Sequence, residues 1–351
     1  MEKKASFTLA IFLCVLIVFL EVGYGADTKL FVFGDSYADT GNTPPIDGFE
    51  CWVEPYGITF PGKPSGRFSD GRVLTDFIAE YLGIRSPVPY RGWKLGLNLQ
   101  KYGMNFAYGG TGVFNTTSGG PNMTAQINDF QQLIQQRVFT KRDLTSSVAH
   151  VSAAGNDYGA LSVGGQKARQ KQSLNSCQDI ESVISQLVLN LKRIYNLGVP
   201  RISVVAVPPF GCLPGDVPIQ PSPNRVCNES QNSFSRLHNQ LLKKAVEQLN
   251  NETGGSTFVI LDLYSSFMSA LNVQNNRSEC CKGTRSGSSC GNVDEDGRKE
   301  YVVCEDPKQS FFWDTLHPSQ QGWLSVFSIV KPSLNTLLLP HATFTSTSAA
   351  I

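Results

Sequence analysis

The sequence has few histidines and no block of like charge. Four histidines occur among its 351 residues, and the formal net charge is +1 at pH 7. Without a run of lysine and arginine, nothing predicts a nucleic-acid partner or an anionic membrane surface. No two cysteines have the Cys-x-x-Cys spacing common in zinc sites, so a zinc site is the less favoured interpretation of the cysteines. We expect neither a metal nor a cofactor.

Long apolar runs are absent beyond the first twenty residues. Phe7–Leu20 is almost wholly apolar, but it is shorter than the ~20 residues that a spanning helix needs. Lysines precede this run and small residues follow it, which is typical of a secretory signal. We therefore predict a signal peptide at residues 1–25, cut before Ala26, and a secreted protein without a stable membrane anchor; an anchoring helix is the alternative.

The cysteines and glycosylation sequons agree with secretion. Eight cysteines remain after residue 25, and an even number in a secreted chain favours disulfides. Cys212 with Cys227 is the first pair that we expect. Two adjacent cysteines are expected to pair separately with two later ones, and these four are Cys280, Cys281, Cys290 and Cys304. Five Asn-x-Ser/Thr sequons lie in polar stretches where a glycan could project: Asn115, Asn122, Asn228, Asn251 and Asn276.

Apolar runs of strand length alternate with segments of helical period. The strand-like runs are Leu30–Phe33, Val148–Ala153, Ile202–Val207 and Phe258–Leu263. The helical patterns are Val73–Leu82, Ile127–Val138, Ile180–Leu197, Ser233–Leu249 and Gln320–Leu337. This alternation predicts a parallel sheet covered by helices on both faces, and the continuously apolar strands fit that burial.

Two stretches interrupt the alternation. Pro208–Asn228 is a Pro-rich loop, and residues 275–307 are polar and hold four cysteines, as expected of an insertion stapled by disulfides. The residues that carry chemistry lie near both ends of the chain. We therefore predict a single domain over residues 26–351, with the Cys-rich insertion at about 275–307.

The first strand-like run ends at a candidate nucleophile. In "KLFVFGDSYADTGN", the apolar residues lead directly into Gly34, Asp35 and Ser36. Ligands of open α/β sheets bind at the carboxyl edge of the strands, where this serine is expected to lie. A serine at this place is also a common helix N-cap or turn residue. The motif therefore indicates a nucleophile only if a base and other catalytic residues occur elsewhere in the sequence.

One histidine is suitably placed to act as the base. His317 follows Asp314 by three residues in "FFWDTLHPS". One tight turn would bring the carboxylate to Nδ1 of the imidazole and orient Nε2 toward a serine, as in a Ser-His-Asp triad. The alternative is a structural loop. His150 lies in a strand-like run, His238 on a helix and His341 in the tail.

Two further motifs offer donors for a developing oxyanion. Asn156 follows a strand-like run in "AAGNDYG", where its side-chain amide could stabilise negative charge. The glycines of "NFAYGGTG" allow a backbone N–H to approach a ligand closely. Each motif alone is equally compatible with an ordinary turn.

Together these four motifs resemble the GDSL esterase/lipase family of the SGNH hydrolases, most closely its secreted plant branch. The resemblance covers Leu30 to about Leu337. It implies a three-layer α/β/α sandwich with a flavodoxin-like parallel sheet of about five strands, over which the insertions roof the site. It also implies catalytic roles for Ser36, Asp314 and His317. The implied oxyanion donors are the N–H groups of Ser36 and Gly110, with Gly109 less favoured, and the Asn156 side chain.

Two positions qualify the resemblance. Tyr37 stands where the family's name-giving leucine is expected, which leaves the substrate less defined. "GSSCG" around Ser289 fits the pattern of a nucleophile elbow, but it lies in the Cys-rich insertion without the strand and helix that the motif requires. We therefore expect Ser36, and not Ser289, to be the nucleophile.

The expected activity is hydrolysis of carboxylic esters through an acyl-enzyme. An acyltransferase using the same intermediate and a non-catalytic secreted glycoprotein are the alternatives. Lipid, polyester, acetylated polysaccharide and small-molecule esters all fit as substrates, and the sequence leaves the oligomeric state open.

Overall fold

The computed structural model describes residues 28–46, 49–97, 99–158, 176–215, 226–274 and 278–338. The predicted signal peptide, the sequon at Asn276 and the tail histidine His341 lie outside these ranges. Among the described helices, none is both long and apolar enough to cross a membrane.

A six-stranded parallel sheet forms the centre of the fold. Its strand order is β2-β3-β1-β4-β5-β6. The strands span Val88–Pro89 (β2), Gly103–Asn105 (β3), Leu30–Gly34 (β1), Val148–Ser152 (β4), Ile202–Ala206 (β5) and Phe258–Asp262 (β6). The four predicted strands are confirmed. The sheet has six strands rather than about five, because β2 and β3 add an edge whose strands are too short to show a sequence period.

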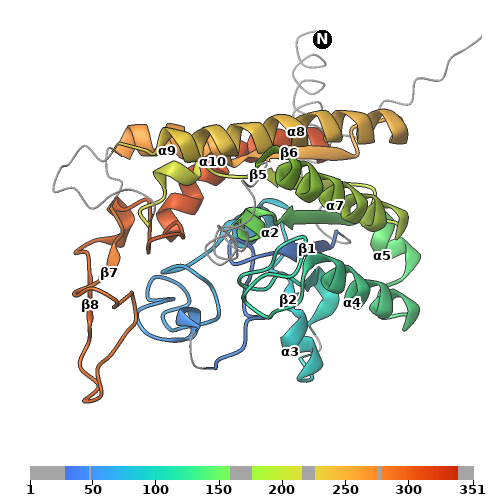
Figure 1. Ribbon diagram of the computed structural model, residues 1–351. Coiled ribbons are helices and arrows are strands. Elements are labelled where there is room, and N and C mark those ends of the chain that lie inside the picture. Colours follow the sequence, from blue (N-terminus) through green and yellow to red (C-terminus); the bar gives the residue numbers. More distant parts are fainter. Residues whose placement is uncertain are drawn as a thin grey trace, which may run out of the picture.

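Helices cover both faces of this sheet (Figure 1). One face carries α4 (Met123–Gln135), α7 (Ser176–Asn196) and α8 (Glu229–Thr253), and the other carries α2 (Leu74–Tyr81), α9 (Leu263–Gln274) and α10 (Gln320–Leu338). Short helices α3 (Tyr90–Lys94) and α5 (Lys141–Thr145) lie in connections. Successive β1 side chains alternate between the two cores: Phe31 and Phe33 face α4, whereas Leu30 and Val32 face α2 and α10. The predicted α/β/α sandwich is confirmed.

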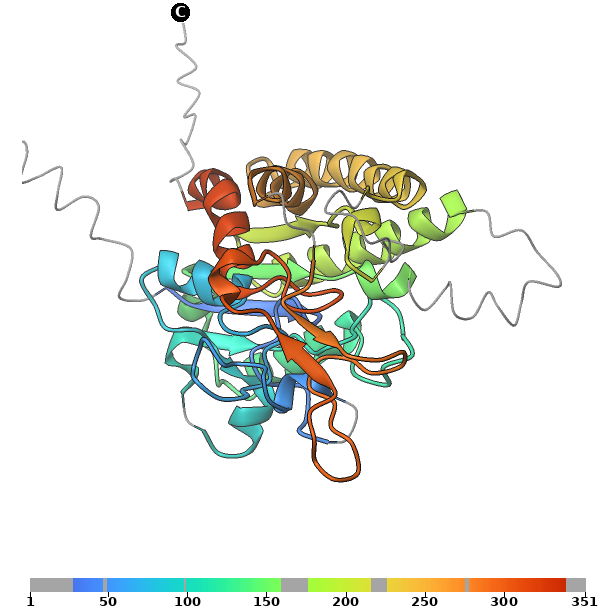
Figure 2. The same cartoon turned by 90° about the vertical axis from the view of Figure 1, so that its left-hand side faces the viewer.

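The Cys-rich insertion forms a small hairpin beside the sandwich. Strands β7 (Cys281–Gly283) and β8 (Tyr301–Val303) pair antiparallel, and the views in Figures 1 and 2 place the orange hairpin next to the blue N-terminal loops. The predicted disulfide between Cys212 and Cys227 is confirmed. The two adjacent cysteines pair separately, as Cys280–Cys304 and Cys281–Cys290. Cys51 is a buried free thiol.

The carboxyl end of β1 packs tightly against the backbone of β4 and the Gln126 side chain of α4. Gly34 has φ of +144°, and a Cβ at this position would lie 1.9 Å from the Ser152 carbonyl oxygen of β4. The Gln126 side chain of α4 accepts a hydrogen bond from the Gly34 N–H at 2.8 Å and donates one to its carbonyl at 2.9 Å. Glycine is required here because no side chain fits, and Ser36 therefore follows a rigidly positioned strand end.

This geometry predicts that Gly34→Ala destabilises the fold by at least ~3 kcal/mol, because the new methyl group overlaps backbone atoms that cannot move independently. Urea unfolding of the two purified proteins measures the difference. The matched control is Gly254→Ala, where φ is +71° but nothing lies within 4 Å of the new Cβ. This control is expected to cost only about 1 kcal/mol. Equal losses in both variants would contradict the steric explanation.

Candidate active site

The structure brings Ser36, His317 and Asp314 together in one hydrogen-bonded chain. The Ser36 Oγ lies 2.9 Å from the His317 Nε2. The other imidazole nitrogen, Nδ1, lies 2.8 Å and 2.9 Å from the two Asp314 carboxylate oxygens. His317 and Asp314 are only 8% and 5% exposed. The order hydroxyl, imidazole and carboxylate is the arrangement in which a serine can be activated as a nucleophile.

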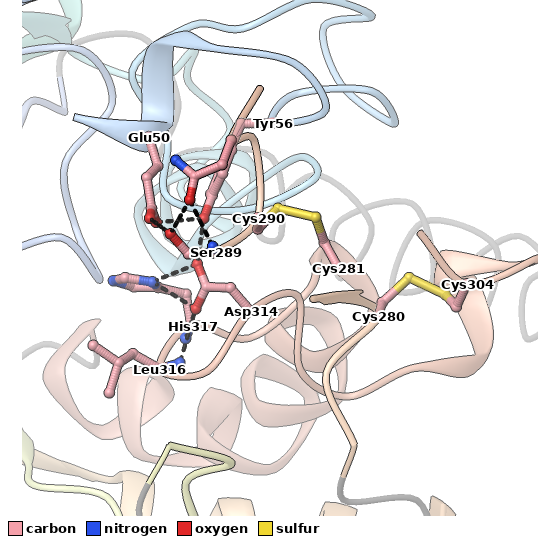
Figure 3. The surroundings of a disulfide bond; sticks show 11 residues. Glu50, Tyr56, Cys280, Cys281, Ser289, Cys290, Cys304, Asp314, Leu316 and His317 are labelled. Atoms are coloured by element: carbon pink, nitrogen blue, oxygen red, sulfur yellow. Dashed lines mark hydrogen bonds and ion pairs between the residues drawn. A yellow bond between two sulfur atoms is a disulfide. The ribbon is translucent and has the colours of Figure 1, made fainter. Parts of the chain in front are cut away.

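The Asp314–His317 turn is built around the carboxylate. Asp314 Oδ1 accepts hydrogen bonds from the backbone N–H groups of Leu316 at 2.8 Å and His317 at 2.7 Å (Figure 3). The Trp313 N–H closes the turn by donating to the His317 carbonyl at 2.8 Å. The predicted tight turn therefore orients both side chains before α10 begins.

The same geometry couples the charges of the pair. Burial disfavours the ionised form of Asp314, but the His317 charge and the hydrogen bonds to the carboxylate hold its pKa below the ordinary value. Burial also disfavours the imidazolium, but Asp314, and to a smaller extent Glu50 and Asp35, raise the pKa of His317 above its ordinary value. His317 is thus a stronger base than a free histidine.

Sequence reasoning missed a tyrosine behind the carboxylate. The Tyr56 hydroxyl lies 2.7 Å from the Asp314 Oδ2 and 3.0 Å from the Glu50 Oε2. Ser289, the serine of the rejected elbow motif, donates from its Oγ to the Glu50 Oε1 at 2.7 Å. No spacing in the sequence connects these three residues to Asp314, because Glu50 and Tyr56 lie in an N-terminal segment and Ser289 in the Cys-rich insertion.

The turn that carries Ser36 is fixed by two aspartates. The Tyr37 N–H donates to the Asp35 Oδ1 at 3.0 Å, which shapes the turn locally. The buried Asp39 carboxylate accepts the N–H groups of Gly41 and Asn42, both at 2.7 Å. Burial raises the pKa of Asp35 to about 7, although the Tyr37 N–H opposes this shift.

Tyr37, the residue that departs from the family pattern, connects the two halves of the site. Its hydroxyl donates to the Leu316 carbonyl at 2.8 Å, one residue before His317. Its ring packs edge-on against the His317 ring, with 5.9 Å between centroids, and against Trp323 of α10 at 5.0 Å. Tyr37 thus braces the histidine turn in addition to lining the pocket beside Ser36.

The predicted oxyanion donors differ in how their N–H groups are used. Gly109 donates to the Thr43 Oγ1 at 2.8 Å, so this N–H is occupied by the fold. Gly110 has φ of +80°, and no hydrogen-bond partner of its N–H occurs among the described residues. The Asn156 Nδ2 donates to the Thr111 carbonyl at 2.9 Å and lies 3.5 Å from the Asp35 Oδ2. This pattern favours Gly110 over Gly109.

A pocket of about 770 Å³ lies in front of Ser36 and His317. Its wall is mainly apolar and comes from the ends of the strands, the loop after β5, and α8: Val205, Val207, Phe210, Leu213, Phe234 and Leu237. The expectation that insertions roof the site is met in part: Pro208, Phe210 and Leu213 of the Pro-rich loop line this pocket, but none of residues 278–307 of the Cys-rich insertion does. That insertion instead contacts Glu50 behind Asp314.

The two other described histidines are structural. His150 is buried in β4, where its Nδ1 lies 3.0 Å from the Ser203 Oγ, and burial lowers its pKa to about 3. His238 on α8 pairs through Nδ1 with the Tyr158 hydroxyl at 2.5 Å, and burial likewise lowers its pKa to about 3. Neither contacts Ser36, so His317 is the base candidate that the described residues offer.

Comparisons of the sequence with a family model and with curated relatives agree with the resemblance predicted from the motifs. A family model described as GDSL-like lipase/acylhydrolase matches residues 30–329. A GDSL esterase/lipase of Arabidopsis thaliana is 47% identical over 361 residues and covers 96% of this chain and 98% of its own. A second from the same plant is 47% identical over 323 residues, covering 88% and 89%. An extracellular lipase structure from Streptomyces rimosus aligns at 12% identity and a TM-score of 0.34, covering 86% and 99%.

The raised pKa of His317 predicts the acid limb of any activity that uses it as a base. Only the neutral imidazole accepts a proton, so kcat/KM should fall as the pH drops, with a midpoint above the ordinary histidine value of 6.5. Asp314→Asn should move this midpoint to lower pH and reduce kcat at least ~10³-fold. A pH profile of kcat/KM measures both effects.

Asp35→Asn is the control for this profile, because burial raises the pKa of the Asp35 carboxyl to about 7. The asparagine keeps the acceptor for the Tyr37 N–H and should preserve the acid limb, shifted slightly to lower pH by the lost negative charge. Disappearance of the limb in Asp35→Asn would assign it to Asp35 and contradict the role of His317.

Proposed function

Because this chain belongs to the GDSL-like lipase/acylhydrolase family, we propose that it is a secreted serine esterase that cleaves carboxylic esters through Ser36, His317 and Asp314. The observation that carries the proposal is the hydrogen-bonded chain of these three side chains at the mouth of a mainly apolar pocket. The family membership supplies the reaction class, an ester hydrolase, and the geometry supports the roles proposed for the three residues.

The first half of the reaction forms an acyl-enzyme. The Ser36 Oγ attacks the ester carbonyl while the His317 Nε2 takes its proton, and negative charge develops on the carbonyl oxygen. The N–H groups of Ser36 and Gly110 and the Asn156 side chain are the proposed donors to that oxyanion. When the tetrahedral intermediate collapses, His317 returns the proton to the departing alkoxide, which leaves as the alcohol.

The second half repeats these steps with water. His317 takes a proton from the water molecule, the hydroxide adds to the acyl carbonyl, and the Ser36 Oγ departs with the proton from His317. The carboxylic acid is released and the serine is restored. Asp314 stays ionised throughout, because its lowered pKa keeps it anionic while the imidazolium forms.

The pocket supports an ester with an apolar acyl or alcohol group. About 770 Å³ lined mainly by valine, leucine and phenylalanine can bury a hydrocarbon chain beside Ser36. Burial of such a chain contributes ~0.8 kcal/mol for each methylene group. A butyrate ester is therefore expected to be bound more tightly than an acetate ester.

Secretion is supported by the oxidised cysteines and the position of the sequons. Three disulfides are typical of proteins that fold outside the reducing cytosol. Asn115, Asn228 and Asn251 are exposed, and half-buried Asn122 donates to the Asn115 Oδ1 at 2.7 Å. The four described sequons thus lie where glycans could be attached, and the signal peptide at residues 1–25 stays a prediction.

Hydrolysis of p-nitrophenyl acetate, butyrate and palmitate by the purified protein tests the proposed function. Ser36→Ala should lose at least ~10³-fold in kcat, because Ser36 is the hydroxyl that is hydrogen-bonded to the His317 Nε2 among the described residues. Ser182→Ala, on the exposed surface of α7, is the control and should behave as the wild type. Full activity of Ser36→Ala would remove Ser36 from the mechanism. Ester products formed only with an added alcohol acceptor would favour the acyltransferase alternative.

A further inference from the structure

Tyr56 gives the Asp314 carboxylate a further donor from a residue that does not line the substrate pocket. The tyrosine is 1% exposed and packs edge-on against Trp313, with 5.9 Å between ring centroids. Its hydroxyl lies between two carboxylates, 2.7 Å from the Asp314 Oδ2 and 3.0 Å from the Glu50 Oε2 (Figure 3). Tyr56 follows the short helix η1 (Glu50–Trp52) and is remote in sequence from the rest of the site.

A phenol has one proton and therefore donates to one of these carboxylates at a time. The shorter contact is with Asp314. The Glu50 Oε2 then lacks the phenolic proton, and a half-buried carboxylate is favourable only if another donor reaches it, here at its second oxygen. The Ser289 Oγ, 2.7 Å from the Glu50 Oε1, supplies that donor.

The Cys-rich insertion holds Ser289 in this position. The Ser289 backbone N–H donates to the Asn292 Oδ1 at 2.6 Å, and its Oγ lies 3.0 Å from the same atom. The Asn292 Oδ1 thus already accepts a hydrogen bond from the backbone. Because a carboxylate is also the stronger acceptor, the Ser289 hydroxyl donates its proton to Glu50. The next residue, Cys290, is tied to Cys281 by a disulfide.

We propose that Ser289, by donating to Glu50, keeps the single phenolic proton of Tyr56 on Asp314, and that Ser289, Glu50 and Tyr56 are positioning residues for the His317–Asp314 pair. The inference rests on the proposed function, which it deepens. It gives the insertion a role at the site although it lines no part of the pocket. The "GSSCG" serine is a hydrogen-bond donor to the site and not a second nucleophile.

The arrangement has a defined effect on the base. With Tyr56 donating, Oδ2 is held facing Nδ1 and part of the carboxylate charge is neutralised. Without that donor, the same oxygen is buried and less neutralised, so it attracts the imidazolium more strongly and raises the pKa of His317 further. The charged groups that act on His317 are Asp314, Glu50 and Asp35, all of them acidic. Loss of Glu50 therefore acts in the opposite direction from loss of the tyrosine hydroxyl.

The test compares Tyr56→Phe, Ser289→Ala, Glu50→Ala and the double variant Glu50→Ala/Ser289→Ala on p-nitrophenyl butyrate. Tyr56→Phe should lower kcat about tenfold with little change in KM and move the acid limb of kcat/KM upward by about half a pH unit. Ser289→Ala should lower kcat about threefold and shift the limb in the same direction. Glu50→Ala should shift it downward.

The double variant tests whether Ser289 acts through Glu50. Once Glu50 is absent, nothing competes for the Tyr56 proton, so adding Ser289→Ala to Glu50→Ala should change neither kcat nor the acid limb. Equal effects of Ser289→Ala with and without Glu50 would overturn the proposal, because they would show a merely structural role. The melting temperature of every variant shows whether it folds. If Tyr56→Phe does not fold, the comparison of Ser289→Ala in the presence and in the absence of Glu50 still decides the question.

The chain offers a matched control for each position. Tyr301→Phe removes a hydroxyl from a buried tyrosine of the same aromatic cluster, without touching Asp314. Ser288→Ala removes the neighbouring serine, whose Oγ bonds only within the insertion, to Arg285. Both controls should keep the wild-type kcat and acid limb. A shift as large as those of Tyr56→Phe and Ser289→Ala would overturn the proposal.

Failure of this inference is distinguishable from failure of the proposed function. If the wild type hydrolyses none of the esters, the proposed function fails, and the pKa of His317 is then measured by NMR titration, assigned from the signal lost in His317→Gln. The upward shift in Tyr56→Phe and Ser289→Ala is expected in that experiment too. An unchanged pKa of His317 in both Tyr56→Phe and Ser289→Ala overturns the inference, whether or not the protein is active.

Discussion

The burial of one negative charge, on Asp314, is the constraint on which the rest of the site depends. Removing an ionised carboxylate from water is costly unless donors and a partner charge replace the lost hydration. Here the replacement comes from two backbone N–H groups, the His317 ring and the Tyr56 hydroxyl. Each donor also fixes another part of the site: the backbone N–H groups fix the turn, the His317 ring is held in its orientation, and Tyr56 fixes the loop that carries it. The same hydrogen bonds therefore stabilise the buried charge of Asp314 and orient the His317 imidazole.

A second set of buried polar groups holds the nucleophile side of the site. Gln126 satisfies both backbone groups of Gly34, and Asn105 donates from its side chain to the Ala38 carbonyl at 2.7 Å, just beyond Ser36. Asn42 donates to the carbonyls of Asn105 and Ala107, both at 2.8 Å. The turn after β1 and the glycine-containing loop after β3 are thus parts of one hydrogen-bonded unit. Tyr37 joins this unit to the histidine turn.

The sequence predicts those features that rest on local pattern. The four long strands and five helices follow from apolar runs and helical period, and Ser36, Asp314 and His317 follow from short motifs with a chemical rationale. β2 and β3 are too short to show any period. The sequence analysis also missed α9, which begins directly where β6 ends, although Asp262 caps it by accepting the Ser265 N–H at 3.0 Å. Glu50 and Tyr56 were missed for a different reason: their partners lie far away in the chain, and only the fold brings them to Asp314. The pairing of Cys280 with Cys304, rather than Cys290, is likewise a property of the hairpin geometry.

The Ser36–His317 hydrogen bond joins residues 281 positions apart. During synthesis Ser36 therefore leaves the ribosome long before His317, and a chain that lacks the segment ahead of α10 carries the serine without the imidazole that contacts it. Because β1 lies in the middle of the sheet, its neighbour β4 also arrives more than a hundred residues later, and formation of the core has to wait for distant segments. The hydrogen-bonded triad is thus completed only when the last part of the chain has joined the fold, and an incomplete chain cannot form it.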